Sequence, residues 1–177
     1  MNKQPKPRLS LRQKIKPYTG FSLIELLVVI GIIGVLATIA IVNIFPVTKK
    51  ARDTKRKADL AQIGRFLSMS CFLPDTGGGE YDLSDLVGQL KIKYPQYAGM
   101  LANAPRDPKI GDETNTHYKY LVTADAKKCA LYANLENEAE PITLGQLTAP
   151  APGGGTGVLS ADTEGANGTR IYFQYSN

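Results

Sequence analysis

The sequence predicts an α+β protein in which a long N-terminal helix packs on a small antiparallel β-sheet. Three observations support this fold class. An uncharged apolar run covers residues 26–45. After it, apolar side chains recur at helical spacing, at Leu60, Ile63, Phe66 and Leu67. Closer to the C-terminus, residues 118–122 and 129–135 alternate as strands do, and residues 170–175 have the composition of a strand.

The apolar run is long enough to cross a membrane. Its 20 residues, at about 1.5 Å each, match the roughly 30 Å hydrocarbon layer, where a segment must be helical to pair its backbone groups. We therefore expect a transmembrane helix over 21–45, in which Gly31 and Gly34 let neighbouring helices approach closely, and an amphipathic extension over 46–70. An ordinary secretory signal is the alternative, but its apolar region is only about 7–15 residues long.

Positive charge is concentrated in residues 1–20, which hold six Lys or Arg and no acidic residue. The whole chain carries 21 basic and 16 acidic residues, a net charge of +5. Without this leader, 15 basic and 16 acidic residues remain, a net charge of −1. The basic character of the whole chain is therefore weak support for nucleic-acid binding. Basic residues also follow the apolar run closely, and charge alone does not orient the helix.

The segment that opens the apolar run, Gly20-Phe21-Ser22-Leu23-Ile24-Glu25, resembles the signal of type IV prepilins and type II secretion pseudopilins. The resemblance continues to about Leu67. It implies that the prepilin peptidase, a membrane aspartyl enzyme, cuts after Gly20 and methylates the new amino terminus at Phe21. It also implies that Glu25 pairs with the amino terminus of a neighbouring subunit and sets its register, since a charge inside a membrane helix requires a partner.

The resemblance implies a structural subunit of a filament and not an enzyme. The implied partners are the prepilin peptidase, identical or related pilin subunits, a membrane-embedded assembly platform and the lipid bilayer. The implied location is the cytoplasmic (inner) membrane, crossed once with the leader in the cytoplasm and the head outside, and then a pilus or a pseudopilus. The sequence does not choose between these two filaments. Many pilins have a proline where Val42 stands, whereas the nearest proline here is Pro46, which leaves the shape of the helix open.

An alternative hypothesis is a minor pilin whose head binds DNA or another ligand at a filament tip. The basic stretch over residues 49–57 suggests it. The same stretch is explained equally by contact with neighbouring subunits or anionic lipid headgroups and by an ordinary solvated helix face. Nucleic acid is not an expected partner.

Residues 71–177 are expected to form a globular α+β head. Ser84 is predicted to cap a short helix that carries Leu86, Val87 and Leu90, and a turn near 125–127 predicts a hairpin. Residues 149–168, rich in Gly, Ala, Pro and Thr, predict a flexible surface loop.

The two cysteines of the head, Cys71 and Cys129, lack CxxC spacing. They form one disulfide if the head lies outside the cytoplasm, and otherwise they are two free buried thiols.

No cofactor is expected, with one candidate exception. Residues 103–122 resemble a segment of major pseudopilins in which some members bind calcium. The oxygen ligands available here are Asp107, Asp112, Glu113 and Asn115. No EF-hand pattern is present, and a solvated acidic loop is the alternative.

Overall fold

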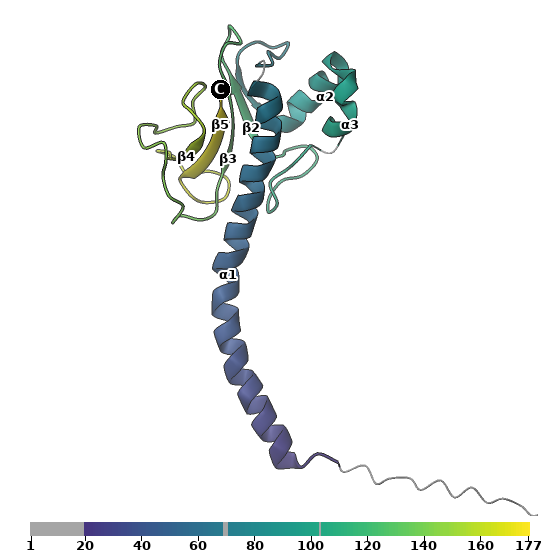
Figure 1. The fold of residues 1–177 in the computed structure, drawn as a ribbon, viewed down its shortest axis with the longest axis vertical. Helices are drawn as coiled ribbons and strands as arrows, with labels where there is room; N and C mark the ends of the chain where they lie inside the picture. The colour runs from purple at the N-terminus through teal and green to yellow at the C-terminus, as the bar shows by residue number, and fades with distance from the viewer. Residues whose placement is uncertain (1–19, 69–70, 103) are drawn as a thin grey trace, which may run out of the picture. The chain divides into compact units, whose positions relative to one another are not determined.

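The computed structural model describes residues 20–68, 71–102 and 104–177, without the side chains at 39–44, 67–68, 97 and 100. Apart from Gly20, the predicted leader lies outside these residues. The helices are α1 (Leu23–Ser68), α2 (Leu83–Lys93), the 3-10 helix η1 (Pro95–Tyr97) and α3 (Ala98–Leu101). The strands are β1 (Gly79–Asp82), β2 (Lys119–Val122), β3 (Cys129–Asn134), β4 (Gly157–Ser160) and β5 (Ile171–Ser176) (Figure 1). The chain divides into two units, Met1–Val42 and Asn43–Asn177.

The α+β class is confirmed, because five strands form one antiparallel sheet beside these helices in the order β1-β2-β3-β5-β4. Strands β2 and β3 form the predicted hairpin, with Tyr120 opposite Leu131. Its turn is closed by a hydrogen bond from the Thr123 N–H to the Lys128 carbonyl, and Ala126 takes a left-handed φ of 54°. The predicted C-terminal strand is β5, which lies between β3 and β4 and so has its register set on both sides.

The structure differs from the sequence prediction at two places in the head. Strand β4 lies inside residues 149–168, where a flexible loop was expected, and its Val158 and Leu159 are buried. Residues 157–160 form a strand in spite of a weak local strand propensity, because each of them pairs with a residue of β5. The predicted Ser84 cap is wrong: Asp82 is the N-cap of α2, and its carboxylate accepts a hydrogen bond from the Ser84 N–H at 3.0 Å.

Helix α1 begins at Leu23 and passes through Pro46 without a break. In the first unit its described side chains are exposed, and a Cβ added at Gly31 or Gly34 would meet no atom within 4 Å. None of the helices in the described part of the chain combines the length and apolar composition needed to cross a membrane. Residues 39–44, which belong to the predicted span, have side chains outside the described set.

The main core of the second unit lies between the later part of α1, the helix α2 and the sheet (Figure 1). Leu60 of α1 has no exposed surface and belongs to one cluster with the buried rings of Tyr118 and Tyr120. Helix α2 contributes Leu83, Leu86, Val87 and Leu90 to this cluster. Leu60, Ile63 and Phe66 of the predicted helical stripe therefore lie on the face of α1 that packs on the head. The Leu67 side chain is outside the described set.

A disulfide joins Cys71, just after α1, to Cys129, the first residue of β3. Of the two alternatives that the sequence leaves open, the structure has the bonded one. The bond ties the segment that leaves α1 to a central strand of the sheet.

Candidate processing site and buried charge cluster

Gly20 and Phe21 precede helix α1 and are not part of it. Both are exposed, and Phe21 has 85% of its surface accessible. The helix starts directly behind them because the Ser22 carbonyl accepts the first helical hydrogen bond, from the Leu26 N–H at 3.1 Å. Ser22 is therefore the N-cap residue. The bond that the sequence predicts to be cut lies outside regular structure.

Ser22 and Glu25 form a reciprocal pair at this helix start. The Ser22 hydroxyl accepts a hydrogen bond from the Ile24 N–H at 3.3 Å, and the Glu25 carboxylate accepts one from the Ser22 N–H at 2.8 Å. This is a variant of the capping box in which the hydroxyl accepts from the second helical residue instead of the third, and it satisfies two backbone donors at the helix start. Glu25 thus has a partner within its own chain, and its predicted role in subunit register stays a prediction.

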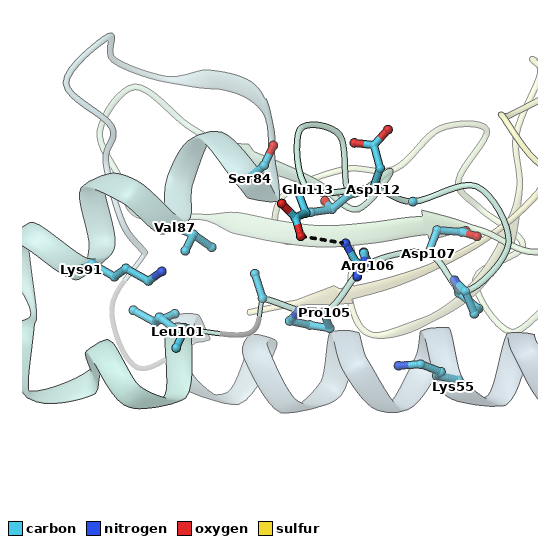
Figure 2. A pocket seen from close by; sticks show the side chains of 15 residues that line it. Lys55, Ser84, Val87, Lys91, Leu101, Pro105, Arg106, Asp107, Asp112 and Glu113 are labelled. Carbon is cyan, nitrogen blue, oxygen red and sulfur yellow. Dashed lines mark ion pairs between the residues drawn. The ribbon is translucent and has the colours of Figure 1, made fainter.

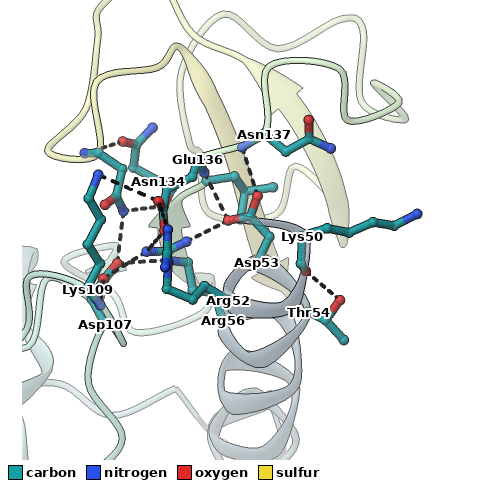
Figure 3. Close-up of polar contacts among 12 residues, drawn as sticks. Lys50, Arg52, Asp53, Thr54, Arg56, Asp107, Lys109, Asn134, Glu136 and Asn137 are labelled. Atoms are coloured by element: carbon teal, nitrogen blue, oxygen red, sulfur yellow. Dashed lines mark hydrogen bonds and ion pairs between the residues drawn. The ribbon is translucent and has the colours of Figure 1, made fainter. Parts of the chain in front are cut away.

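A buried charge cluster joins α1 to the head in the second unit (Figure 3). We use this name for Arg52, Asp53, Arg56, Asp107 and Glu136. The Arg56 guanidinium has no exposed surface and makes a bidentate pair with Asp107, at 2.8 and 2.9 Å. The same guanidinium contacts Asp53 at 2.6 Å and Glu136 at 2.7 Å. Arg52 closes the cluster with a second bidentate pair to Glu136.

Backbone and amide groups complete the cluster. The Asp53 carboxylate accepts hydrogen bonds from the N–H groups of Glu136 and Asn137, which follow β3. The Asp107 carboxylate accepts from the Lys109 N–H and from the Asn167 side-chain amide. Four segments distant in sequence therefore meet at one set of charges. Buried charges are stable only when they are paired and hydrogen-bonded in this way.

The pKa values of the cluster follow from burial and from these bonds. Burial opposes the charged form of Asp107, but the hydrogen bonds from Arg56 outweigh it and lower the pKa of this carboxyl to about 2. Burial opposes the charge of Glu136 as well, and the bonds from Arg52 and Arg56 lower its pKa to about 2. Burial also acts to lower the pKa of the Arg56 guanidinium, whereas its bonds to Asp107 and Glu136 raise it above its ordinary value. These groups stay charged at neutral pH.

The cluster changes the interpretation of the basic stretch at 49–57. Arg56 is buried, Arg52 pairs with Glu136, and the two lysines at 55 and 57 pair with Asp59 and Glu140. Most of these cations are therefore paired with carboxylates of the second unit. The basic stretch then no longer supports DNA binding, which requires free positive charge. Sequence analysis missed the cluster, although one signal was present: Asp53 and Arg56 continue the buried helical stripe of Leu60 at the same spacing.

The candidate calcium ligands do not converge. Asp107 is engaged by Arg56. The Asp112 carboxylate turns back to its own loop, where it accepts hydrogen bonds from the N–H groups of Thr114 and Asn115. The Glu113 side chain is 92% exposed. Within residues 20–68, 71–102 and 104–177, no three His, Cys, Asp or Glu side chains are grouped so that they could hold a metal ion.

A pocket of about 830 Å³ lies between α1, α2 and the segment that carries these acids (Figure 2). Lys55 of α1 and Lys91 of α2 line it from two sides. Arg106 also lines it, 4.0 Å from the Glu113 carboxylate. Its charges are of both signs, so the pocket does not select a ligand of one charge.

Comparison with known proteins identifies the N-terminal segment. Residues 15–41 match the model of the prokaryotic N-terminal methylation motif. The chain therefore carries the prepilin-type cleavage and methylation signal that its residues 20–25 predict. This signal is characteristic of type IV pilin-like and pseudopilin-like precursors. No curated protein and no solved structure matches the chain.

Proposed function

We propose that the protein is a structural subunit of a type IV pilus-like filament or of a type II secretion pseudopilus, made as a precursor that is cut after Gly20. The observation that carries the proposal is the methylation motif over residues 15–41. The exposed, non-helical Gly20–Phe21 bond in front of α1 supports it, because a peptidase requires access to the backbone. Both kinds of filament use this signal, so the proposal includes both.

In this proposal the apolar part of α1 first holds the subunit in the cytoplasmic membrane and then packs in the filament core. The uncharged run over 26–45 supports membrane insertion. The disulfide between Cys71 and Cys129 supports a head outside the cytoplasm, because such bonds persist in oxidising compartments. The partners are then the prepilin peptidase, the assembly platform and further pilin subunits. The role is structural rather than catalytic.

The direct test is the amino terminus of the mature protein. The full-length precursor is expressed with and without a prepilin peptidase, purified from membranes, and analysed by N-terminal sequencing and intact mass. We expect the product to start at Phe21 and to carry one methyl group when the peptidase is present. A Gly20→Val variant is the control, because its branched side chain beside the cut should block processing. A product that starts at another residue would refute the proposal.

Glu25 tests the assembly part of the proposal. In Glu25→Ala and Glu25→Gln we expect cleavage after Gly20 and membrane retention but a strongly reduced filament yield. Glutamine keeps a hydrogen-bond acceptor for the Ser22 N–H and removes only the charge. Equal losses in both variants therefore indicate that the charge is required. Filament yield is measured by shearing and immunoblotting, with Glu138→Ala as an exposed control. An unchanged yield in Glu25→Gln contradicts the register role.

A further inference from the structure

The N–H of Ile24 has two competing acceptors at the start of α1. In a regular α-helix the N–H of residue i bonds to the carbonyl of residue i−4, and for Ile24 that carbonyl belongs to Gly20. This is the carbonyl of the bond cut in the proposed function. In the structure the Ile24 N–H instead donates to the Ser22 hydroxyl at 3.3 Å. The Ser22 hydroxyl therefore accepts the hydrogen bond that the Gly20 carbonyl would accept if the helix began two residues earlier.

We propose that Ser22 is a positioning residue for processing: its side chain ends the helix at residue 22 and so leaves the Gly20 carbonyl free for the peptidase. The inference rests on the proposed function, because it concerns the bond that the prepilin peptidase cuts. Glu25 supports Ser22 by holding the Ser22 N–H at 2.8 Å. Two independent findings support this inference: the methylation motif, and the hydrogen bonds at the start of α1.

Without the Ser22 cap, the helix has a suitable earlier starting point. Alanine at position 22 has the highest helix propensity and no acceptor for the Ile24 N–H. Glycine is an acceptable N-cap residue, and Gly20 is the nearest one upstream. The carbonyl of an N-cap residue accepts the first helical bond, so a helix capped at Gly20 would engage the scissile carbonyl.

This engagement would slow hydrolysis for a simple reason. In the cut, water adds to the Gly20 carbonyl carbon and the C–N bond to Phe21 breaks. Gly20 leaves as a carboxylic acid, and the Phe21 nitrogen takes a proton and leaves as an amine. A carbonyl held in a helical hydrogen bond must first be released by local unfolding, which lowers the reactive fraction of the precursor.

The test compares Ser22 variants of the full-length precursor, in detergent or membranes, with a prepilin peptidase. Ser22→Thr and Ser22→Val form a matched pair, because their side chains have similar size and only threonine supplies an acceptor. Ser22→Ala and Ser22→Asp are a second pair, since aspartate is as good a cap as serine. We expect Thr and Asp variants to have a kcat/KM within about twofold of wild type, and Ala and Val variants about fivefold lower, the factor that corresponds to the ~1 kcal/mol of a lost cap.

Hydrogen exchange at the Ile24 amide provides a second readout on the same variants. The inference requires that the Ala variant be cut slowly while its Ile24 amide stays protected, now by the Gly20 carbonyl. Equal rates for all variants, or rates that follow side-chain size so that Val resembles Thr, overturn it. The proposed function has its own failure, namely that the wild-type precursor is not cut at Gly20–Phe21. The two failures are therefore distinguishable.

Discussion

At residue 56 an arginine with no exposed surface lies among three carboxylates, those of Asp53, Asp107 and Glu136. Taking these charges out of water is unfavourable, and the contacts among them compensate for that loss. The arrangement is therefore sensitive to the removal of a single partner. The cluster stabilises the head only when all of its charges are present, because removal of one cation leaves several buried carboxylates with too few hydrogen-bond donors.

Arg56→Leu should destabilise the head by about 3–5 kcal/mol, the usual effect of breaking a buried ion pair. The measurement is urea denaturation of residues 43–177, the second unit of the chain. Arg106→Leu is the matched control, because that arginine is 52% exposed and lies 4.0 Å from its carboxylate partner. We expect the control to change stability by no more than about 0.5 kcal/mol. A similar loss in both variants would contradict the role assigned to the cluster.

The same residues predict an acid-sensitive stability. The pKa of Asp107 falls from 3.8 to about 2 on folding, and that of Glu136 from 4.5 to about 2. A depressed folded-state pKa stabilises the protein above the unfolded-state pKa, and this contribution is lost as the pH falls from about 4.5 towards 2. Each such carboxyl contributes on the order of 2–4 kcal/mol.

Denaturation at neutral pH and near pH 3 measures this loss. Arg56→Leu should lose less stability than wild type over that interval, because Asp107 no longer has its main donor and Glu136 loses one of its two arginine donors. Identical pH dependence in the two proteins would show that other carboxyls, such as Asp82 with its pKa of about 2, account for the effect.

At the scale of elements, Gly64 of α1 lies directly against Tyr175 of β5. A Cβ built on this glycine would lie 2.2 Å from the Tyr175 ring, well inside contact distance. The helix and the strand approach this closely only because position 64 has no side chain. The sequence shows a glycine within a helical pattern, and the structure shows what it packs against.

Gly64→Ala should therefore destabilise the head by about 1–3 kcal/mol, the effect of overpacking, although alanine normally favours a helix over glycine. Gly88→Ala in α2 is the control: nothing lies within 4 Å of its added Cβ, and we expect a gain of up to about 1 kcal/mol. Thermal or urea denaturation of residues 43–177 measures both. The double variant Gly64→Ala, Tyr175→Ala should show no further loss from the alanine at 64; additive losses would exclude the steric cause.

At the scale of the whole molecule, the disulfide restrains the head. The bond between Cys71 and Cys129 closes a loop with a sequence separation of 58, which contains β1, α2 and β2. Closing such a loop reduces the conformational freedom of the unfolded chain, by about 4 kcal/mol in the chain-entropy model. The head therefore depends on oxidation for part of its stability, in keeping with the proposed location outside the cytoplasm.

The double variant Cys71→Ser, Cys129→Ser should lower the free energy of unfolding by about 2–4 kcal/mol. Wild-type protein with reductant should fall to the same value, and the variant should not respond to reductant. Denaturation with and without dithiothreitol measures all four cases. A wild-type protein that is insensitive to reductant, with its cysteines verified as reduced, would contradict the prediction.

The larger elements of the head were predictable because their signals are local. The 3.6-residue stripe around Leu60 and the alternation around Tyr120 report which face each element buries. Strand β4 was not predictable in this way, since its ladder comes from β5. The Asp82 cap was missed because Ser84 is an equally good cap residue two positions later.

The sequence by itself determined the processing signal, because Gly20, Phe21 and Glu25 lie within six consecutive residues and the methylation motif is a continuous segment of sequence. Only the tertiary structure decided the partners of the basic stretch. Arg56 and Asp107 are 51 residues apart, and no local pattern specifies a pair that forms only when the chain folds back on α1. The same physical reason applies to Gly64, whose neighbour Tyr175 is supplied by the last strand of the sheet.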